Sequence, residues 1–268
     1  RLAAETAKAM KVVDPSLQLV SCGSSHVDMP TFPEWEAVTL SHTYEYVDFI
    51  SMHQYFRNDE NDTGDFLAFS QDLEHFIHTV IATCDYVKAK TRSDKTMYLS
   101  FDEWNVWFHS NAADEEEMSA RPWQAAPSLL EDVYTFEDAL VVGLALITFM
   151  RHADRIKMAC LAQLVNVIAP IMTEKDGGAW RQTIFYPFLH ASRYGRGTAL
   201  QPMISCGKHD TKKHSDVTDV EAVAIHDEEV SELTIFAVNR NTEEDIPFEI
   251  MLSGFAELIP IEYIVMEN

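Results

Sequence analysis

The hydrophobic positions in the first two-thirds of the chain alternate between strand-like and helix-like patterns. Apolar runs of strand length occur at residues 17–25 and 46–56, in the stretch 96–109, and in the stretch 156–170, which also includes an exit loop. They are apolar throughout rather than alternating, which is typical of a sheet covered on both faces. Longer amphipathic stretches separate them, and this repeated strand-helix order predicts parallel βα units.

The stretches between the runs predict helices. The clearest is residues 66–91, where apolar residues recur at spacings of three and four. Further helices are expected over residues 1–13, ended by Asp14 and Pro15, and over residues 129–152. A last helix in "TIFYPFLHASRYG" should end at Gly195. The acidic stretch 111–126 is expected to be a solvated loop.

The pattern changes after about residue 197. Short apolar segments separated by polar turns follow, which predicts an all-β module of the sandwich type. The chain should therefore divide into an α/β region, residues 1–196, and a β region, residues 197–268. The predicted strands of the second region are residues 198–205, 221–229, 232–241, 246–254 and 257–267.

Charge restricts the partners. The chain carries 43 acidic and 20 basic residues, a formal net charge of −23. Such a surface is repelled by nucleic acid and by anionic membranes, so neither is expected as a partner. The longest uncharged apolar run, residues 139–150, is too short to span a bilayer.

The four cysteines form no C-x-x-C pair and lie in or beside apolar segments. This predicts buried free thiols, a reducing compartment and a cytoplasmic location. They are Cys22, Cys84, Cys160 and Cys206.

The stretch 96–109 contains two adjacent carboxylates, Asp102 and Glu103. Alternate residues of a strand share a face, which would place Glu103 with Leu99 and Phe101 and turn Asp102 toward the helices. A carboxylate there would need a buried partner. Catalytic groups of parallel barrels emerge from inward positions at the carboxyl ends of strands, so the alternation favours Glu103.

The same alternation places His53 and Tyr55 at the end of the second run and Gln163 at the end of the fourth, with Trp104 and Trp107 just past the third strand. A carboxylate, a phenol, an amide and an indole suit a sugar site, where polar groups bind hydroxyls and flat rings cover C–H surfaces. The alternatives are structural: a solvated Glu103, a core amide at Gln163 and a core imidazole at His53.

Three motifs at these residues, "SFDEWNVW", "ISMHQYF" and "LAQLVNVIAPI", closely resemble the α-L-arabinofuranosidases of glycoside hydrolase family 51. The resemblance extends over essentially the whole chain and weakens after about Gly197. It implies a (β/α)₈ barrel with an attached β-sandwich. It also implies retaining hydrolysis of terminal non-reducing α-L-arabinofuranosyl groups from arabinose-containing polysaccharides or oligosaccharides, without a metal or cofactor.

By this resemblance Glu103 is the nucleophile, Tyr55 orients it, and His53, Trp107 and Gln163 bind the sugar. The family's acid/base glutamate follows an asparagine at the end of the fourth barrel strand, in a context that this sequence lacks. The chain is therefore expected to hold barrel strands five to eight and part of the sandwich, with both ends cut. Alone, it should be inactive.

An open half barrel would leave two unpaired strand edges. Association with a second copy or with the missing half is expected for that reason. The rival interpretation is a non-catalytic carbohydrate-binding or assembly fragment. His75 and His78 lie three residues apart on a predicted helix without an evident third ligand, so a solvated helix face and no metal site are expected.

Overall fold

A four-stranded parallel sheet organises the first region of the protein. The computed structural model describes residues 1–255 and 258–267. The strands pair in sequence order, β1-β2-β3-β4, and all are parallel. Each predicted apolar run contributes one strand, although the first is short. The strands are β1 (Val20–Ser21), β2 (Phe49–Phe56), β3 (Tyr98–Val106) and β4 (Ile156–Leu161).

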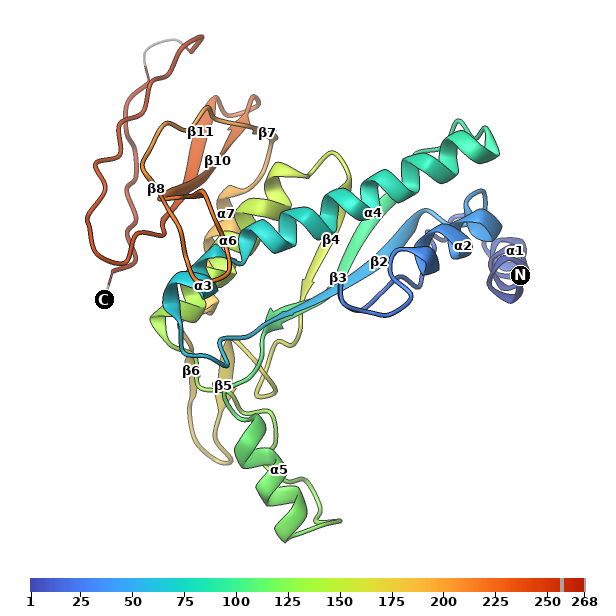
Figure 1. Cartoon of the computed structure of the whole chain (residues 1–268), viewed down its shortest axis with the longest axis horizontal. Helices are drawn as coiled ribbons and strands as arrows, with labels where there is room; N and C mark the ends of the chain where they lie inside the picture. The colour runs from blue at the N-terminus through green and yellow to red at the C-terminus, as the bar shows by residue number, and fades with distance from the viewer. Residues whose placement is uncertain (256–257, 268) are drawn as a thin grey trace.

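Helices follow the strands and cover one face of this sheet (Figure 1). The predicted helix 66–91 divides at Phe69 into two helices, because α3 ends at Ala68 and α4 begins at Ser70. The helices of this region are α1 (Leu2–Val13), α2 (Glu34–Thr43), α3 (Thr63–Ala68), α4 (Ser70–Thr91), α6 (Phe136–Arg151) and α7 (Phe185–Tyr194).

Aromatic side chains hold the helices against the sheet. Phe101 of β3 lies 6.2 Å from Phe76 of α4 and 4.7 Å from Phe149 of α6, measured between ring centroids. Trp104 of β3 contacts Phe149 at 5.0 Å. Phe101 and Trp104 are fully buried. Burial of such rings is among the largest contributions to a core, and the edge-to-face arrangement adds to it.

The acidic stretch 111–126 was wrongly predicted to be a loop throughout. It contains helix α5 (Asn111–Ala120), which projects away from the rest of the molecule (Figure 1). Alanine, glutamate and methionine have high helix propensity, so the run can form a helix while staying solvated. Asp114 in its first turn is favourably placed for the helix dipole and accepts a hydrogen bond from the Ser110 hydroxyl at 2.7 Å.

The second region contains a three-stranded antiparallel sheet of order β11-β10-β7. Its β10 face packs on α6, where Ile147 clusters with Val223 and Ile225. Within the described residues these apolar side chains are therefore buried against a helix. The strands are β7 (Thr198–Leu200), β10 (Val220–Asp227) and β11 (Glu232–Asn239), with the short pairs β5 (Ile171–Thr173) with β6 (Ala179–Arg181) and β8 (Lys208–His209) with β9 (Val217–Thr218).

Two of the five predicted strands of this region are wrong as far as the chain is described. Residues 246–254 and 258–267 form no strand. A strand is stabilised by ladder hydrogen bonds to a neighbouring strand, and an apolar sequence alone does not supply that neighbour. Several large apolar side chains of these stretches are exposed: Phe248, Ile250, Met251, Ile259, Ile261, Tyr263, Ile264 and Val265.

A buried charge network joins the two regions. The guanidinium of Arg240, at the end of β11, lies 3.0 Å from Glu221 of β10 and donates to the Ser70 hydroxyl of α4 at 2.8 Å. Arg151 of α6 also pairs with Glu221. Arg240 is only 2 % exposed, so these contacts must replace the water that its charge loses.

The prediction that all cysteines are buried is wrong. All four are free, but Cys22 and Cys160 are exposed and Cys206 is half-buried, which leaves only Cys84 in the core. Cys22 lies just past the end of β1, and Cys160 lies near the carboxyl end of β4, an edge strand of the four-stranded sheet. Apolar sequence neighbours did not guarantee burial at these strand ends.

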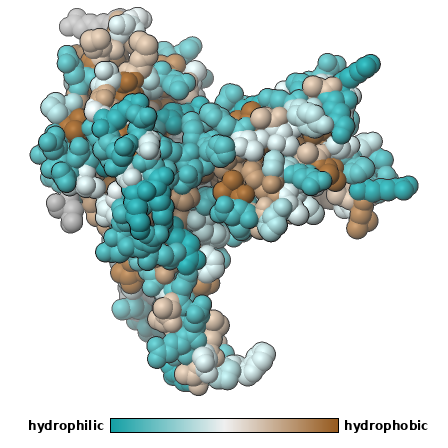
Figure 2. All heavy atoms as spheres, viewed as in Figure 1, coloured by the Kyte–Doolittle hydropathy of each residue, from teal (hydrophilic) through white to brown (hydrophobic). Residues whose placement is uncertain are grey.

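The surface agrees with the acidic composition. Figure 2 shows hydrophilic residues over most of the viewed face, with apolar residues in small groups. Of the helices in the described ranges, none combines the length and apolar character that crossing a bilayer requires.

Candidate active site

A bulge in β3 controls which side chains reach the sheet face opposite the helices. Phe101 pairs with Met52, but the next pair is Glu103 with His53, so Asp102 is an extra residue in β3. The pairing with β4 shows the same shift, from Phe101 opposite Ala159 to Trp104 opposite Leu161. Such a bulge interrupts the alternation of side chains along a strand.

Regular alternation predicted that Glu103 shares a face with Phe101. The bulge makes this prediction wrong, although Glu103 still points away from the helices. Residues in register share a face, so Glu103 lies with His53 and on the side of Ser51 and Ser100. Phe101 instead faces the helices, as its contacts with their aromatic rings show. Without the bulge, Glu103 would follow Phe101 into the helix layer.

Tyr55 and Glu103 form the closest polar contact at this end of the sheet. The Tyr55 hydroxyl donates to Oε1 of Glu103 at 2.7 Å. Partial burial raises the pKa of Tyr55 well above its ordinary value, and the hydrogen bond to the carboxylate raises it further. The phenol therefore keeps its proton and remains a donor to a carboxylate at any physiological pH.

His53 lies between both carboxylates of the predicted site. Its Nε2 is 3.0 Å from Oδ1 of Asp102, and its Nδ1 is 3.7 Å from Oε2 of Glu103. The Asp102 side chain is 37 % exposed, so the expected burial of Asp102 against the helices is wrong. The bulge is the reason, because it frees Asp102 from the regular alternation and lets it reach His53.

Of the two tryptophans expected at the site, only Trp107 lies beside Tyr55, and the expectation for Trp104 is wrong because it is buried against α6. The Trp107 ring meets that of Tyr55 edge to face, with centroids 5.2 Å apart and an interplanar angle of 71°. Its indole nitrogen is buried and has no hydrogen-bond partner among the described residues. A buried donor without a partner is rare in native proteins, so this N–H is available to an acceptor that enters the site.

Gln163 lies at the same end of the sheet but is not part of the contact group. Its side chain is exposed, and within the described chain no hydrogen bond joins it to Glu103, His53 or Tyr55. The neighbouring backbone is fixed, because the Ala162 N–H donates to the Trp104 carbonyl at 3.0 Å. The structure thus unites Glu103, Tyr55, His53 and Trp107 and leaves Gln163 at the periphery.

Asn105 is a supporting residue that the sequence analysis missed. It is fully buried, two positions beyond Glu103, and its side-chain amide donates to the carbonyls of Ala162 at 2.7 Å and Ile168 at 2.6 Å. These bonds fix the segment after β4 against β3. The available signal was an amide flanked by the apolar residues Trp104 and Val106, because a buried amide must find partners.

Asp132 fixes the segment of chain that follows β3 and Trp107. Its carboxylate accepts backbone hydrogen bonds from Phe108, His109 and Ser110 at 3.1, 3.0 and 3.0 Å. His109 in turn lies 2.9 Å from Asp138, and this contact raises the pKa of His109 despite its partial burial.

Comparison with known proteins decides the family. Residues 102–268 match the family model described as the α-L-arabinofuranosidase C-terminal domain. The chain belongs to the α-L-arabinofuranosidases of glycoside hydrolase family 51. A solved family 51 α-L-arabinofuranosidase from Bifidobacterium longum superposes with a TM-score of 0.84 at 42 % identity, over 89 % of this chain and 49 % of that one.

Curated members of the family agree. The chain is 65 % identical to an intracellular exo-α-(1→5)-L-arabinofuranosidase of Acetivibrio thermocellus, covering 100 % of this chain and 54 % of that protein. It is 60 % identical to intracellular exo-α-(1→5)-L-arabinofuranosidase 1 of Bacillus subtilis, covering 100 % of this chain and 53 % of the relative. The chain thus spans about half the length of these arabinofuranosidases.

Proposed function

We propose that Glu103 is the nucleophile of a retaining α-L-arabinofuranosidase. The observation that carries this proposal is the 2.7 Å hydrogen bond from Tyr55 to Glu103 at the carboxyl end of a parallel strand. One carboxylate oxygen attacks the anomeric carbon, the bond to the leaving oxygen breaks, and a glycosyl ester forms. Water then hydrolyses the ester with retention.

Tyr55 has a positioning role in this proposal. Its donated hydrogen bond holds one oxygen of Glu103 and favours the ionised carboxylate, which is the nucleophilic form. The same bond stabilises the carboxylate when it leaves in the second step. Because the pKa of Tyr55 is raised, the phenol does not compete as an anion.

His53, Trp107 and Gln163 are proposed to bind the sugar. The indole N–H of Trp107 is free to donate to a hydroxyl, and its ring stands beside the Tyr55–Glu103 pair. Imidazole nitrogens of His53 sit between two carboxylates, where they help to fix the arrangement of polar groups around the sugar. Gln163, exposed at the edge, would contact the sugar only from the periphery.

We further propose that these 268 residues do not include the acid/base carboxylate. A retaining glycosidase places its two carboxyl groups roughly 5–5.5 Å apart on opposite sides of the scissile bond. Asp102 is unsuited to this role, because it is adjacent to Glu103 and pairs with His53. The strands β1 to β4 would then be strands five to eight of a (β/α)₈ barrel, completed by the missing half or by a second copy.

The substrate proposed is a terminal non-reducing α-L-arabinofuranosyl group, with arabino-oligosaccharides linked 1→5 as the first candidates because of the names of the two curated relatives. Those names also support a cytoplasmic location. We also propose a domain boundary near residue 197, between the barrel part and the β region. The chemistry described needs no metal or organic cofactor.

The test is covalent labelling of the purified chain with an aryl α-L-arabinofuranoside whose leaving group has a low pKa. Such a leaving group needs little protonation, so the first step can proceed without the acid. We expect one arabinosyl adduct on the peptide that contains Glu103, found by mass spectrometry, and no rapid turnover. Glu103→Gln should abolish the adduct, and Asp102→Asn should retain it.

Other outcomes separate the alternatives. An adduct on another residue would contradict the role of Glu103. Rapid multiple turnover of a natural arabinoside would contradict the absence of the acid/base group. Saturable arabinoside binding that Glu103→Gln leaves intact, without any adduct, would support the rival carbohydrate-binding fragment.

A further inference from the structure

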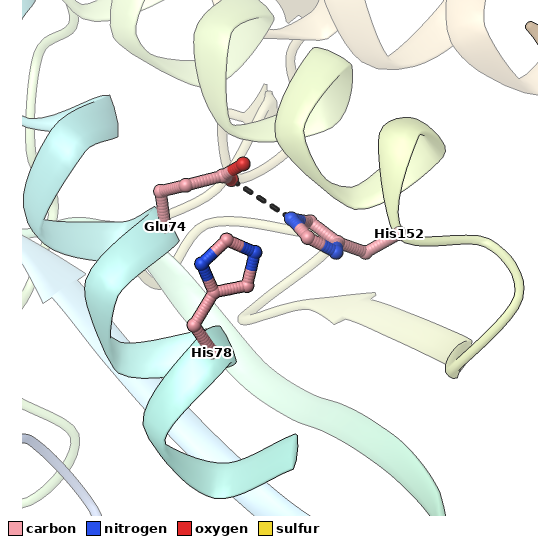
Figure 3. Close-up of side chains that lie close together, drawn as sticks. All are labelled: Glu74, His78 and His152. Atoms are coloured by element: carbon pink, nitrogen blue, oxygen red, sulfur yellow. Dashed lines mark ion pairs between the residues drawn. The ribbon is translucent and has the colours of Figure 1, made fainter. Parts of the chain in front are cut away.

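Three metal-ligating side chains meet on the helix-covered side of the molecule, away from Glu103. They are Glu74 and His78 of α4 and His152 at the end of α6 (Figure 3). One ligand atom from each lies within 4.8 Å of the others. His75, which the sequence analysis paired with His78, is not in this group.

The backbone explains why the three side chains converge. Glu74 and His78 are four residues apart on one helix, so they project from the same face one turn apart. His152 directly follows the last residue of α6 and is its C-cap. Its N–H donates to the carbonyls of Thr148 and Phe149, both at 3.2 Å, which fixes its position opposite α4.

Glu74 and His152 approach each other closely without forming a hydrogen bond of good geometry. Oε2 of Glu74 lies 2.9 Å from Nε2 of His152, yet both atoms are buried and have no aligned hydrogen-bond partner among the described residues. Two ligands of one tetrahedral ion lie about 3.3 Å apart when each bond is roughly 2.0–2.1 Å. The pair therefore needs only a small adjustment to share an ion.

The charge around Glu74 suits a cation at that oxygen. Its other oxygen, Oε1, lies 3.2 Å from Arg151, and Arg151 also pairs with Glu221. Arg151 is thus already shared between two carboxylates. Glu74 thus presents one carboxylate oxygen to Arg151 and the other to His152.

We propose that Glu74, His78 and His152 bind one divalent transition-metal ion, with Zn²⁺ favoured, and that this ion clamps α4 to the end of α6. Two imidazoles and a carboxylate are a common ligand set for Zn²⁺, whereas Mg²⁺ and Ca²⁺ prefer oxygen ligands alone. His78 is exposed, so the ion can enter from solvent and complete its shell with water. The site lies in the helix layer, so its role is structural.

The test is titration of the metal-free purified chain with Zn²⁺ by calorimetry. We expect one ion per chain and an increase in the unfolding temperature. His78→Ala should weaken binding at least about tenfold, because loss of a ligand should cost no less than loss of a group that supports one. His75→Ala is the matched control, since His75 is an exposed histidine on the same helix outside the cluster.

The absorption spectrum of bound Co²⁺ tests which side chains bind the ion. Bound Co²⁺ should give visible absorption bands of a tetrahedral or five-coordinate site, lost in both His78→Ala and His152→Ala. Absence of Zn²⁺ binding by the wild-type chain, or equal affinity in His78→Ala, would overturn the proposal.

Discussion

The hydroxyl of Tyr55 and the carboxylate of Glu103 lie 2.7 Å apart across two neighbouring parallel strands. Their alignment depends on the bulge at Asp102, which brings Glu103 opposite His53. In a regular ladder Asp102 would take that place and Glu103 would lie opposite Gln54. A hydrogen bond between strand ends is held by both ladders, so it is a rigid element of the site. It links the fold to the proposed chemistry most directly.

Replacing Tyr55 by phenylalanine removes this donor and keeps the ring that meets Trp107. We expect adduct formation on Glu103 to slow by about 10²-fold, because the donor holds the attacking carboxylate in place and a small misplacement of a reacting group has an effect of this order. The measurement is the rate of mass increase after mixing with the aryl arabinofuranoside. Tyr98→Phe is the control, since Tyr98 lies at the other end of β3; an equal loss there would indicate general misfolding.

The ion pair of His109 and Asp138 predicts a pH dependence of stability. The pKa of His109 is raised in the folded state by Asp138, so the folded state binds a proton more tightly than the unfolded state. The resulting stability is fully present below about pH 6.5 and is lost as the pH rises through the folded-state pKa. Urea unfolding of wild type and His109→Gln between about pH 5.5 and 8.5 measures this. The free energies of unfolding of the two proteins should differ at low pH and approach each other at high pH. A difference that is constant across this range would contradict the prediction.

Gly23 follows β1 at a point where no side chain fits. A Cβ there would lie 2.0 Å from the carbonyl oxygen of Ser51 in β2. Gly23→Ala must displace backbone, and we expect a loss of about 1–3 kcal/mol in the free energy of unfolding. Gly178→Ala is the control, because nothing lies within 4 Å of its added carbon, and it should change stability by less than about 0.5 kcal/mol.

Substitution of the buried Arg240 should strongly reduce the stability of the protein. Arg240→Ala leaves Ser70 and the Thr218 carbonyl without their donor and removes one partner of Glu221. Breaking a buried pair costs about 3–5 kcal/mol, and the remaining Arg151–Glu221 pair should keep the loss near the lower value. Chemical denaturation measures it. Arg57→Ala, which breaks an exposed pair with Asp59, should cost less than about 1 kcal/mol.

The sequence by itself determined the elements whose patterns are local. Apolar spacing of three and four located α4, and unbroken apolar runs located the four parallel strands. The reason is that the side chains that an element buries must be apolar, and their spacing follows the period of that element. The motif around Glu103 and Tyr55 also identified the family without coordinates. The helix α5 was missed because a charged run can be a helix or a loop with equal solvation.

Only the tertiary structure decided what depends on pairing between distant segments. The bulge at Asp102 exists in relation to β2 and β4, so no count along β3 alone could reveal it. The segments 246–254 and 258–267 have strand-like composition without a ladder partner in the described chain. His78 acquires Glu74 and His152 as neighbours because α6 ends beside α4, a packing relation that the spacing of His75 and His78 does not contain.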